Sequence, residues 1–361
     1  MTILGLHHIT LATGDAQKNI DFYSGVLGLR FVKKTVNFDD PGSYHLYFGD
    51  QTGTPGTAIT FFEWPHAAKG KPGLGGTHHF ALRVASTDAL LQWKRRLTDL
   101  EIKVFGPFNR TYFTSIYFRD PDGALIEIAT EGPGFSVDEP ADSLGERIIP
   151  PPPEHLPGSA SREEFKLQTW DDPVATILPG MSLTAGMHHI SAYARNIETS
   201  HKFFGELLGL NLVKKTASYE DAESSHWYWG VGEGTPGSLI TIFERDPRTE
   251  PPARYGVGQT HHYAFRVADE ETQLTWREKL LSAGLPVSPV MDRVYFKSIY
   301  SKDPDGHIVE IATDTPGFMV DEDEAELGQN LRLPPWLEQH RSDIEQILRP
   351  VEVPAWDEVD A

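Results

Sequence analysis

Alternating apolar and polar positions, broken by turn residues, dominate the chain from its first strand onward. At residues 8–11, two aliphatic side chains alternate with His8 and Thr10, and strand residues two apart share a face. Residues 15–26 carry apolar side chains at helical spacing, with Asp15 placed to cap the helix. Three further strands, which complete a βαβββ unit, are predicted at 29–36, 44–48 and 57–62.

The same order of elements returns directly afterwards. A strand that ends at residue 84 precedes a helix at about 87–100, and strands follow near 104, at 112–118 and at 125–129. The second half of the chain repeats this pattern. The sequence therefore predicts an α+β fold of four βαβββ units, two per half, with cupped mixed sheets.

An internal duplication underlies this repetition. His8 and His189 are 181 positions apart, whereas Glu127 and Glu310 are 183 apart, and the extra two residues fall in a loop of the second half. So many matches in the same order establish a tandem duplication. The recurring segments are 7–10 with 188–191, 27–29 with 208–210, 33–35 with 214–216, 53–56 with 234–237, 77–79 with 260–262, 120–123 with 303–306 and 133–135 with 316–318.

The duplication divides the chain into four parts. The two repeats are expected at residues 1–139 and 184–320, each with two βαβββ units. Between them, residues 140–183 hold four consecutive prolines and are expected to form a linker or packed arm. Residues 321–361 form an acidic tail, in which a short amphipathic helix is expected at 336–348.

Composition removes several classes of function. The formal charge of −20 across 361 residues disfavours nucleic acid and anionic membranes as partners. The absence of cysteine excludes disulfides, thiolate nucleophiles and cysteine-type zinc sites. No signal-like or long apolar segment is present, so we expect a cytoplasmic protein. A metal would have to be held by histidine and carboxylate, which favours Fe(II), Mn(II) or Zn(II).

A histidine pair opens each βαβββ unit, and a glutamate lies in the last strand of each half. Neighbouring strand residues point to opposite faces, so one ring of each pair is expected to face inward. Glu310 lies in an otherwise apolar run, where a carboxylate requires solvent or a cation. Two imidazoles and one carboxylate would leave coordination positions open for substrate and dioxygen. The alternative is that these residues are surface polar groups. The pairs are His7-His8, His78-His79, His188-His189 and His261-His262.

Three more residues near Glu310 suggest substrate binding. Arg293, Tyr295 and Tyr300 lie on the strand segments before it, and an arginine with a tyrosine beside a metal suits an anionic oxygen. The alternative is a core tyrosine and a surface ion pair. No glycine-rich phosphate loop and no G-x-S-x-G nucleophile motif is present, and the two DPDG segments are typical of hairpin turns.

Several of these segments resemble the ring-cleaving dioxygenases of the vicinal oxygen chelate superfamily, most nearly the hydroquinone and chlorohydroquinone 1,2-dioxygenases. They are the histidine pairs, the LGLRFVKKT segment at 27–35, the GTPG segment at 53–56 and the run EIATDTPGF from Glu310. The resemblance covers nearly the whole chain and implies two tandem vicinal-oxygen-chelate domains. It further implies that the first and fourth units close into one cleft, whereas the residues alone leave open a cleft with His189 in place of His8.

The resemblance also implies roles for individual residues. Iron(II), with Mn(II) as the alternative, would be held by His8, His262 and Glu310. Further active-site residues would be His7, Thr10, His261, Arg293 and Tyr300. His261 is the expected acid or base, although alternation would point it away from the face of His262.

The chain differs from the family in retaining a second copy of the site. His79, Glu127 and His189 remain, with Arg110 and Tyr117 at the positions equivalent to Arg293 and Tyr300. By pseudo-twofold symmetry, the second and third units would form a second metal site. A silent copy is the alternative.

We therefore expect a non-haem Fe(II) dioxygenase that cleaves the ring of a hydroquinone-type or catechol-type diol with O2 in aromatic catabolism. The rivals are a glyoxalase-like lyase, which uses zinc or nickel and usually two carboxylates, and a metal-free binding protein of the resistance type. Metal analysis separates the three. Ring substituents and cleavage position are left open, as is a homo-oligomer.

Overall fold

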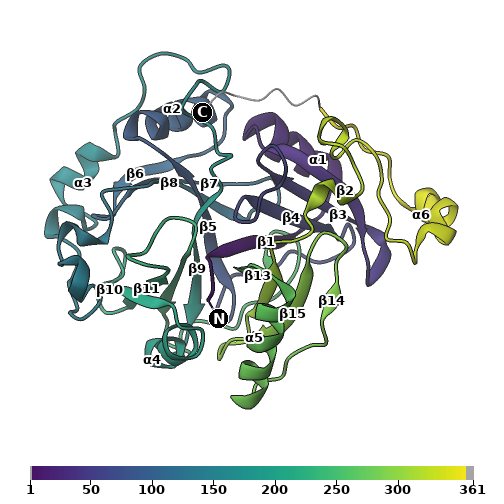
Figure 1. The fold of residues 1–361 in the computed structure, drawn as a ribbon. Helices are drawn as coiled ribbons and strands as arrows, with labels where there is room; N and C mark the ends of the chain where they lie inside the picture. The colour runs from purple at the N-terminus through teal and green to yellow at the C-terminus, as the bar shows by residue number, and fades with distance from the viewer. Residues whose placement is uncertain (1, 355–361) are drawn as a thin grey trace. The chain divides into compact units, whose positions relative to one another are not determined.

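The computed structural model describes residues 2–354, which form two compact units. Unit 1 contains the described residues of 2–71, 255–302 and 308–354, and unit 2 contains 72–254 and 303–307. Each unit is built around one mixed eight-stranded sheet (Figure 1). No helix among the described residues is long and apolar enough to cross a membrane.

The sheet of unit 1 joins the first and the last βαβββ units of the chain. At its centre β1 pairs antiparallel with β13 and parallel with β4. In order across the sheet, the strands are β14 (Met291–Asp292), β15 (Lys297–Lys302), β16 (Ile308–Thr313), β13 (Thr260–Val267), β1 (Leu6–Thr13), β4 (Ala58–Glu63), β3 (Asp40–Gly49) and β2 (Arg30–Asn37).

The sheet of unit 2 has the same order, built from the second and third βαβββ units. Here β9 pairs antiparallel with β5 and parallel with β12. Its strands are β10 (Asn211–Ala217), β11 (Ser225–Gly230), β12 (Leu239–Glu244), β9 (Met187–Ala194), β5 (Thr77–Val84), β8 (Leu125–Thr130), β7 (Thr114–Arg119) and β6 (Phe105–Asn109).

Repeats and compact units thus divide the chain differently. The repeats at 1–139 and 184–320 are halves of the sequence, whereas each compact unit takes one βαβββ module from each half. The cause is strand pairing, because β1 joins β13 of the other half and β5 joins β9. The cleft between the first and fourth modules that the family resemblance implied is therefore present within unit 1.

Helices are few, and α1 begins at the predicted cap. The Asp15 side chain accepts a hydrogen bond from the backbone N–H of Lys18 at 3.1 Å, as an N-cap does. The helix expected at 15–26 continues beyond α1 as a wider π-helical turn. The α-helices are α1 (Ala16–Ile20), α2 (Thr87–Asp99), α3 (Ala160–Phe165), α4 (Ile197–His201), α5 (Glu270–Ser282) and α6 (Arg341–Ile347), and the π-helical turns are Asp21–Val26 and Lys202–Leu207.

Buried lysines hold the tail and the segment just before the linker against their sheets. Lys33 Nζ lies 2.6 Å from Asp321 Oδ1 and also contacts Glu322, and the lysine side chain is fully buried. Lys214 makes the same contacts with Asp138 and Glu139, the equivalent pair at the end of the first repeat. Because a buried ammonium requires partners of opposite charge, these contacts fix both segments in place.

Short helices punctuate the linker and the tail. The linker contains α3, which the sequence did not predict and which Ser159 caps. The helix expected at 336–348 is shorter than predicted, because α6 begins only after a 3₁₀ turn. The 3₁₀ turns are Phe135–Val137, Ala141–Ser143, Pro153–His155, Phe318–Val320, Glu324–Glu326 and Glu338–His340.

Candidate metal centre

Three predicted ligands converge on one face of the unit 1 sheet. His8 on β1 and Glu310 on β16 both lie opposite Ala264 of the strand between them, so the three residues form one row. His262 lies two residues before Ala264 on the same face. The small side chain of Ala264, which is fully buried, leaves room for the imidazole and the carboxylate to meet above it.

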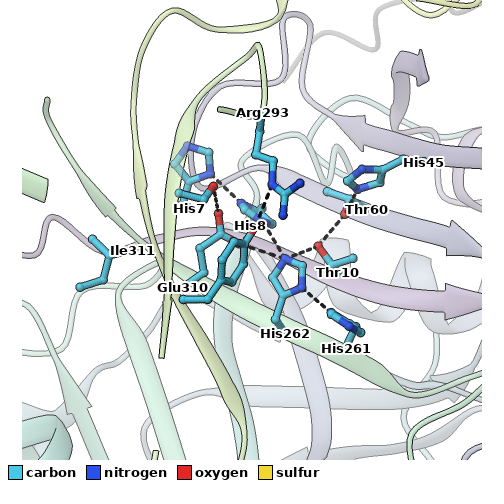
Figure 2. A network of polar contacts seen from close by, with 12 residues as sticks. His7, His8, Thr10, His45, Thr60, His261, His262, Arg293, Glu310 and Ile311 are labelled. Carbon is cyan, nitrogen blue, oxygen red and sulfur yellow. Dashed lines mark hydrogen bonds and ion pairs between the residues drawn. The ribbon is translucent and has the colours of Figure 1, made fainter. Parts of the chain in front are cut away.

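The three ligand atoms are separated by the distances expected for ligands of one metal ion (Figure 2). His8 Nε2 is 3.2 Å and His262 Nε2 is 3.0 Å from Glu310 Oε2, and the two nitrogens are 3.2 Å apart. Metal–ligand bonds of about 2.1 Å at right angles place neighbouring ligand atoms about 3.0 Å apart. The three residues could therefore hold one metal ion and would leave its other coordination positions free.

Hydrogen bonds fix the tautomer of His8. His7 Nε2 lies 3.1 Å from the carbonyl oxygen of Thr313, so this nitrogen must carry a proton. Burial and the neighbouring His8 lower the pKa of His7 to about 3, so His7 is neutral and its Nδ1 is an acceptor. His8 Nδ1, at 2.9 Å, must then donate. With the proton on Nδ1, Nε2 of His8 would be free to bind a metal ion beside Glu310.

The pair on β13 repeats this contact, since His262 Nδ1 lies 2.8 Å from His261 Nδ1. Burial, followed by the charge at His262, lowers the pKa of His261 to about 3. If His262 Nε2 binds a metal, its Nδ1 carries the proton and donates to His261. Neutral His261 then keeps its own proton on Nε2 and becomes a hydrogen-bond donor.

The expectation that only one ring of each pair faces the site is wrong for β13, because both His261 and His262 line the same cavity. The pairing with β1 passes from Thr10↔His262 to Leu11↔Thr260, so His261 is the extra residue of a β-bulge. A bulge interrupts the alternation of faces and re-aims the side chain. His7 occupies the corresponding bulge on β1 and turns towards Thr313.

Glu310 is anionic in this setting. Burial alone would raise its pKa, but the adjacent His8 and His262, as proton donors in the metal-free site, hold that pKa well below the usual range. Its other oxygen accepts a hydrogen bond from Ser298 Oγ. Two imidazole nitrogens lie 3.0–3.2 Å from Oε2. A bound cation would replace the protons between these nitrogens and the fully buried carboxylate, so the three groups are a ligand set for a metal ion.

A cavity of about 320 Å³ is lined by two of the three ligands, His8 and His262. Arg293 Nε donates to Tyr300 Oη at 3.3 Å, and Tyr300 lies opposite Glu310 in the register of β15 and β16. Burial raises the pKa of Tyr300, so the phenol keeps its proton. Tyr295, by contrast, lies in the core and bonds Asp321. The walls are mainly aromatic, formed by Phe38, His45, Tyr47, Phe62, Trp64 and Phe296.

A chain of hydrogen bonds leads from His262 to a histidine that the sequence analysis missed. Thr10 Oγ1 lies 2.9 Å from His262 Nε2 and 2.7 Å from Thr60 Oγ1, which lies 3.0 Å from His45 Nε2 (Figure 2). Tyr47 Oη lies 2.9 Å from the other nitrogen of His45. A signal for His45 existed in the sequence, because His226 repeats it 181 positions later.

The second set of predicted ligands converges in unit 2. His79, Glu127 and His189 bring one ligand atom each to within 4.8 Å of the others, and all three are buried. Ala81 lies between His189 and Glu127 in the strand register, as Ala264 does in unit 1.

Comparison with known proteins identifies the class. The sequence profile described as "Glyoxalase/Bleomycin resistance protein/Dioxygenase superfamily" matches residues 5–128 and 186–311. The chain belongs to this superfamily, and its two sheets have the vicinal oxygen chelate fold. Within the superfamily, its relatives make it an enzyme of the dioxygenase type.

Two sequence relatives and two solved structures are similar to this chain. "Putative ring-cleaving dioxygenase MhqA" of Bacillus subtilis (strain 168) is 35% identical over 352 residues, covering 98% of this chain and 100% of the relative. "Chlorohydroquinone/hydroquinone 1,2-dioxygenase" of Sphingobium indicum is 29% identical over 337 residues, covering 92% of each chain.

A crystal structure of a "putative dioxygenase" from Bacillus subtilis has a TM-score of 0.77 and 32% identity, covering 98% of this chain and 99% of that one. Glyoxalase I from Zea mays, at 14% identity and a TM-score of 0.57 over 86% of this chain and 92% of its own, shares the fold alone.

Proposed function

We propose that the unit 1 site binds Fe(II) through His8, His262 and Glu310 and opens the ring of a dihydroxybenzene with O2. The observation that carries this proposal is the convergence of two imidazole lone pairs and a buried carboxylate at 3.0–3.2 Å beneath an aromatic cavity. Mn(II), which accepts the same nitrogen and oxygen donors, is the alternative metal. The cluster has one carboxylate rather than the two usual in a glyoxalase-like lyase.

Iron, when bound, would hold the diol and dioxygen side by side and pass electrons between them. The protein supplies binding, orientation and protons. Arg293 and Tyr300 lie where a phenolate oxygen would face them, and a fixed guanidinium stabilises such an anion in a dry site. His261 donates from Nε2 to the substrate or to dioxygen. Phe62 and Phe296 pack beside the ligand histidines and exclude water.

Two further residues contact the ligands. His7 holds the proton of His8 on Nδ1, which keeps Nε2 available. Thr10 Oγ1 lies 2.9 Å from His262 Nε2, so in the metal-free site its hydroxyl bonds the nitrogen that the metal would take. The net reaction adds both atoms of O2 to the diol, breaks one ring carbon–carbon bond and the O–O bond, and needs no external reductant.

Oxygen uptake tests the proposal. Protein loaded anaerobically with Fe(II) is mixed with hydroquinone, a chlorinated hydroquinone or catechol in an oxygen electrode, and bound metal is measured in parallel. We expect uptake of one O2 per diol, lost in His262→Ala and Glu310→Gln together with the iron of this site. No uptake with any uncharged dihydroxybenzene would refute the function. Lyase activity of the zinc- or nickel-loaded protein without oxygen uptake would indicate a glyoxalase-like lyase. A protein that binds no metal would indicate a binding protein.

A further inference from the structure

Unit 2 holds a second cluster with the same geometry as the first. His79 Nε2 is 2.7 Å and His189 Nε2 is 3.2 Å from Glu127 Oε2, and the two nitrogens are 3.0 Å apart. Glu127 is fully buried. Neither of its oxygens has a hydrogen-bond donor among the residues described, because Ser115 bonds Tyr117 where its counterpart Ser298 bonds Glu310. This carboxylate therefore requires a cation even more than Glu310 does.

The groups around the first cluster recur around the second. Arg110 lies over the ring of Tyr117 at 5.3 Å, as Arg293 lies over Tyr300 at 5.4 Å. His78 Nδ1 lies 2.7 Å from His79 Nδ1, and His226 Nε2 bonds Thr241 at 2.9 Å. The second site has thus kept its three ligands, the histidine pair that orients His79 and the arginine–tyrosine pair placed to hold an anionic oxygen.

The second cavity is larger, about 450 Å³, and its charge differs. Its lining contains four arginines and one carboxylate, that of Glu220. The lining of the first cavity contains one arginine and one aspartate. Two of the additional arginines have clear origins. Arg245 occupies the position equivalent to Trp64, and Arg162 comes from α3 of the linker, outside the repeats.

The single carboxylate does not neutralise this cavity. Glu220 Oε1 is shared between Arg162, at 2.7 Å, and Arg110, at 3.2 Å. Arg245 lies over the rings of Tyr193 and Phe243 at 5.1 and 5.5 Å, and Asp221, its nearest carboxylate, is 3.8 Å away and half exposed. Such a wall attracts a ligand that is both flat and negatively charged, since a guanidinium binds carboxylate and also stacks on aromatic rings.

We propose that His79, His189 and Glu127 form a second divalent metal site, and that its cavity takes a dihydroxyarene bearing a carboxylate. The ring hydroxyls bind at the metal, with the substrate carboxylate towards Arg245 and Arg162. With O2 as co-reactant, one ring carbon–carbon bond and the O–O bond break, and both oxygen atoms enter the product. The diol supplies the four electrons that dioxygen accepts. The reaction, though not the metal site, rests on the function proposed for unit 1.

Metal content tests the site without any turnover. Full-length protein and the variants His262→Ala and His189→Ala are loaded with Fe(II) without oxygen, desalted and analysed for iron per chain. We expect two iron ions in the parent and one in each variant. One ion in the parent that is lost in His262→Ala and kept in His189→Ala would overturn the second site. This outcome would leave the first site intact, so the two proposals fail separately.

Substrate charge tests the cavity. In the His262→Ala background, oxygen uptake is measured with 2,5- and 3,4-dihydroxybenzoate and with hydroquinone and catechol. We expect the carboxylated diols to be preferred at least tenfold in kcat/KM, with KM raised at least tenfold by Arg245→Gln. Arg248→Gln is the matched control, because Arg248 is an exposed arginine of the same segment that does not line the cavity.

Each remaining result decides the matter. If His262→Ala binds iron but consumes no oxygen with either dihydroxybenzoate, while the parent opens hydroquinone, the second reaction is refuted. Equal preference for charged and uncharged diols, or equal effects of Arg245→Gln and Arg248→Gln, would refute the assigned substrate class. If neither site opens any diol, the function proposed for unit 1 fails, and the iron count still decides the second site.

Discussion

The bulge histidine His7 gives the sharpest test of how this fold tunes its metal ligands. His7→Phe preserves a ring that packs on Phe296, 4.9 Å away, but removes the acceptor for His8 Nδ1. Without metal, His8 can move its proton to Nε2 and donate to Glu310, so little is lost. Metal on Nε2 forces the proton onto Nδ1 of the buried His8, whose acceptor among the described residues is His7. The variant therefore pays a penalty only in the metal-bound state.

The size of that penalty follows from the cost of a buried, unpaired donor. Such a donor costs about 1–3 kcal/mol, which corresponds to a metal affinity weaker by about 5- to 150-fold. Losses of 10- to 100-fold are typical when a residue that orients a metal ligand is replaced. His7→Gln, which retains an amide oxygen as acceptor, should recover part of the affinity.

Chelator competition under anaerobic conditions measures this change. A Glu127→Gln background leaves only the unit 1 cluster, and His340→Phe, which replaces an exposed histidine, serves as the control. Thermal unfolding with and without metal should show a smaller metal-induced rise in Tm for His7→Phe. If His7→Phe, with unchanged circular dichroism, binds Fe(II) within twofold of its parent, the tautomer reasoning is wrong.

Three further predictions concern packing and charge. In the Glu127→Gln background, Ala264→Leu should abolish metal binding at unit 1, measured as iron per chain, because the larger side chain fills the space where His8 and Glu310 meet; retained iron would contradict this. Burial alone would lower the pKa of His307, but the charge and hydrogen bond of Asp303, 2.6 Å away, raise it above the ordinary value. The resulting stabilisation is complete below about pH 6.5 and is lost as pH rises through the folded pKa. His307→Ala introduces the residue that the first repeat carries at the equivalent position, Ala124. Urea unfolding at several pH values should show that the unfolding free energy of this variant depends less on pH, and an unchanged pH dependence would contradict the prediction. Lys33→Met leaves two carboxylates without their ammonium and should lower the unfolding free energy by about 3–5 kcal/mol. Denaturant titration measures this change, and a loss below about 1 kcal/mol would refute the prediction.

The strands and ligand identities were predictable because both follow local rules. A two-residue period places His8 and Thr10 on one face, and a glutamate in an apolar strand needs a cation wherever that strand lies. Strand partners do not follow from such rules, since alternation defines a face and not a neighbour. The residues alone therefore left His8 and His189 as equal choices for the fourth module.

Bulges and tertiary contacts account for the other differences. Alternation predicted that His261 points away from His262, and one inserted residue in the ladder reversed this. His45 reaches the cavity from the opposite side of the sheet centre, through contacts that no motif encodes. Arg162 lies outside the repeats, so neither duplication nor family resemblance assigned it to a cavity.

The interleaving of modules determines when each site can form during synthesis. All ligands and cavity residues of unit 2 lie between 78 and 245, whereas the unit 1 cluster needs residue 8 and residue 310 together. On the ribosome, the central strand of the amino-terminal module cannot meet β13 before residues 260–267 have been synthesised. The chain segment that forms the second site is thus synthesised before all ligands of the first site are present. Truncation after the first repeat would leave each centre short of at least one ligand.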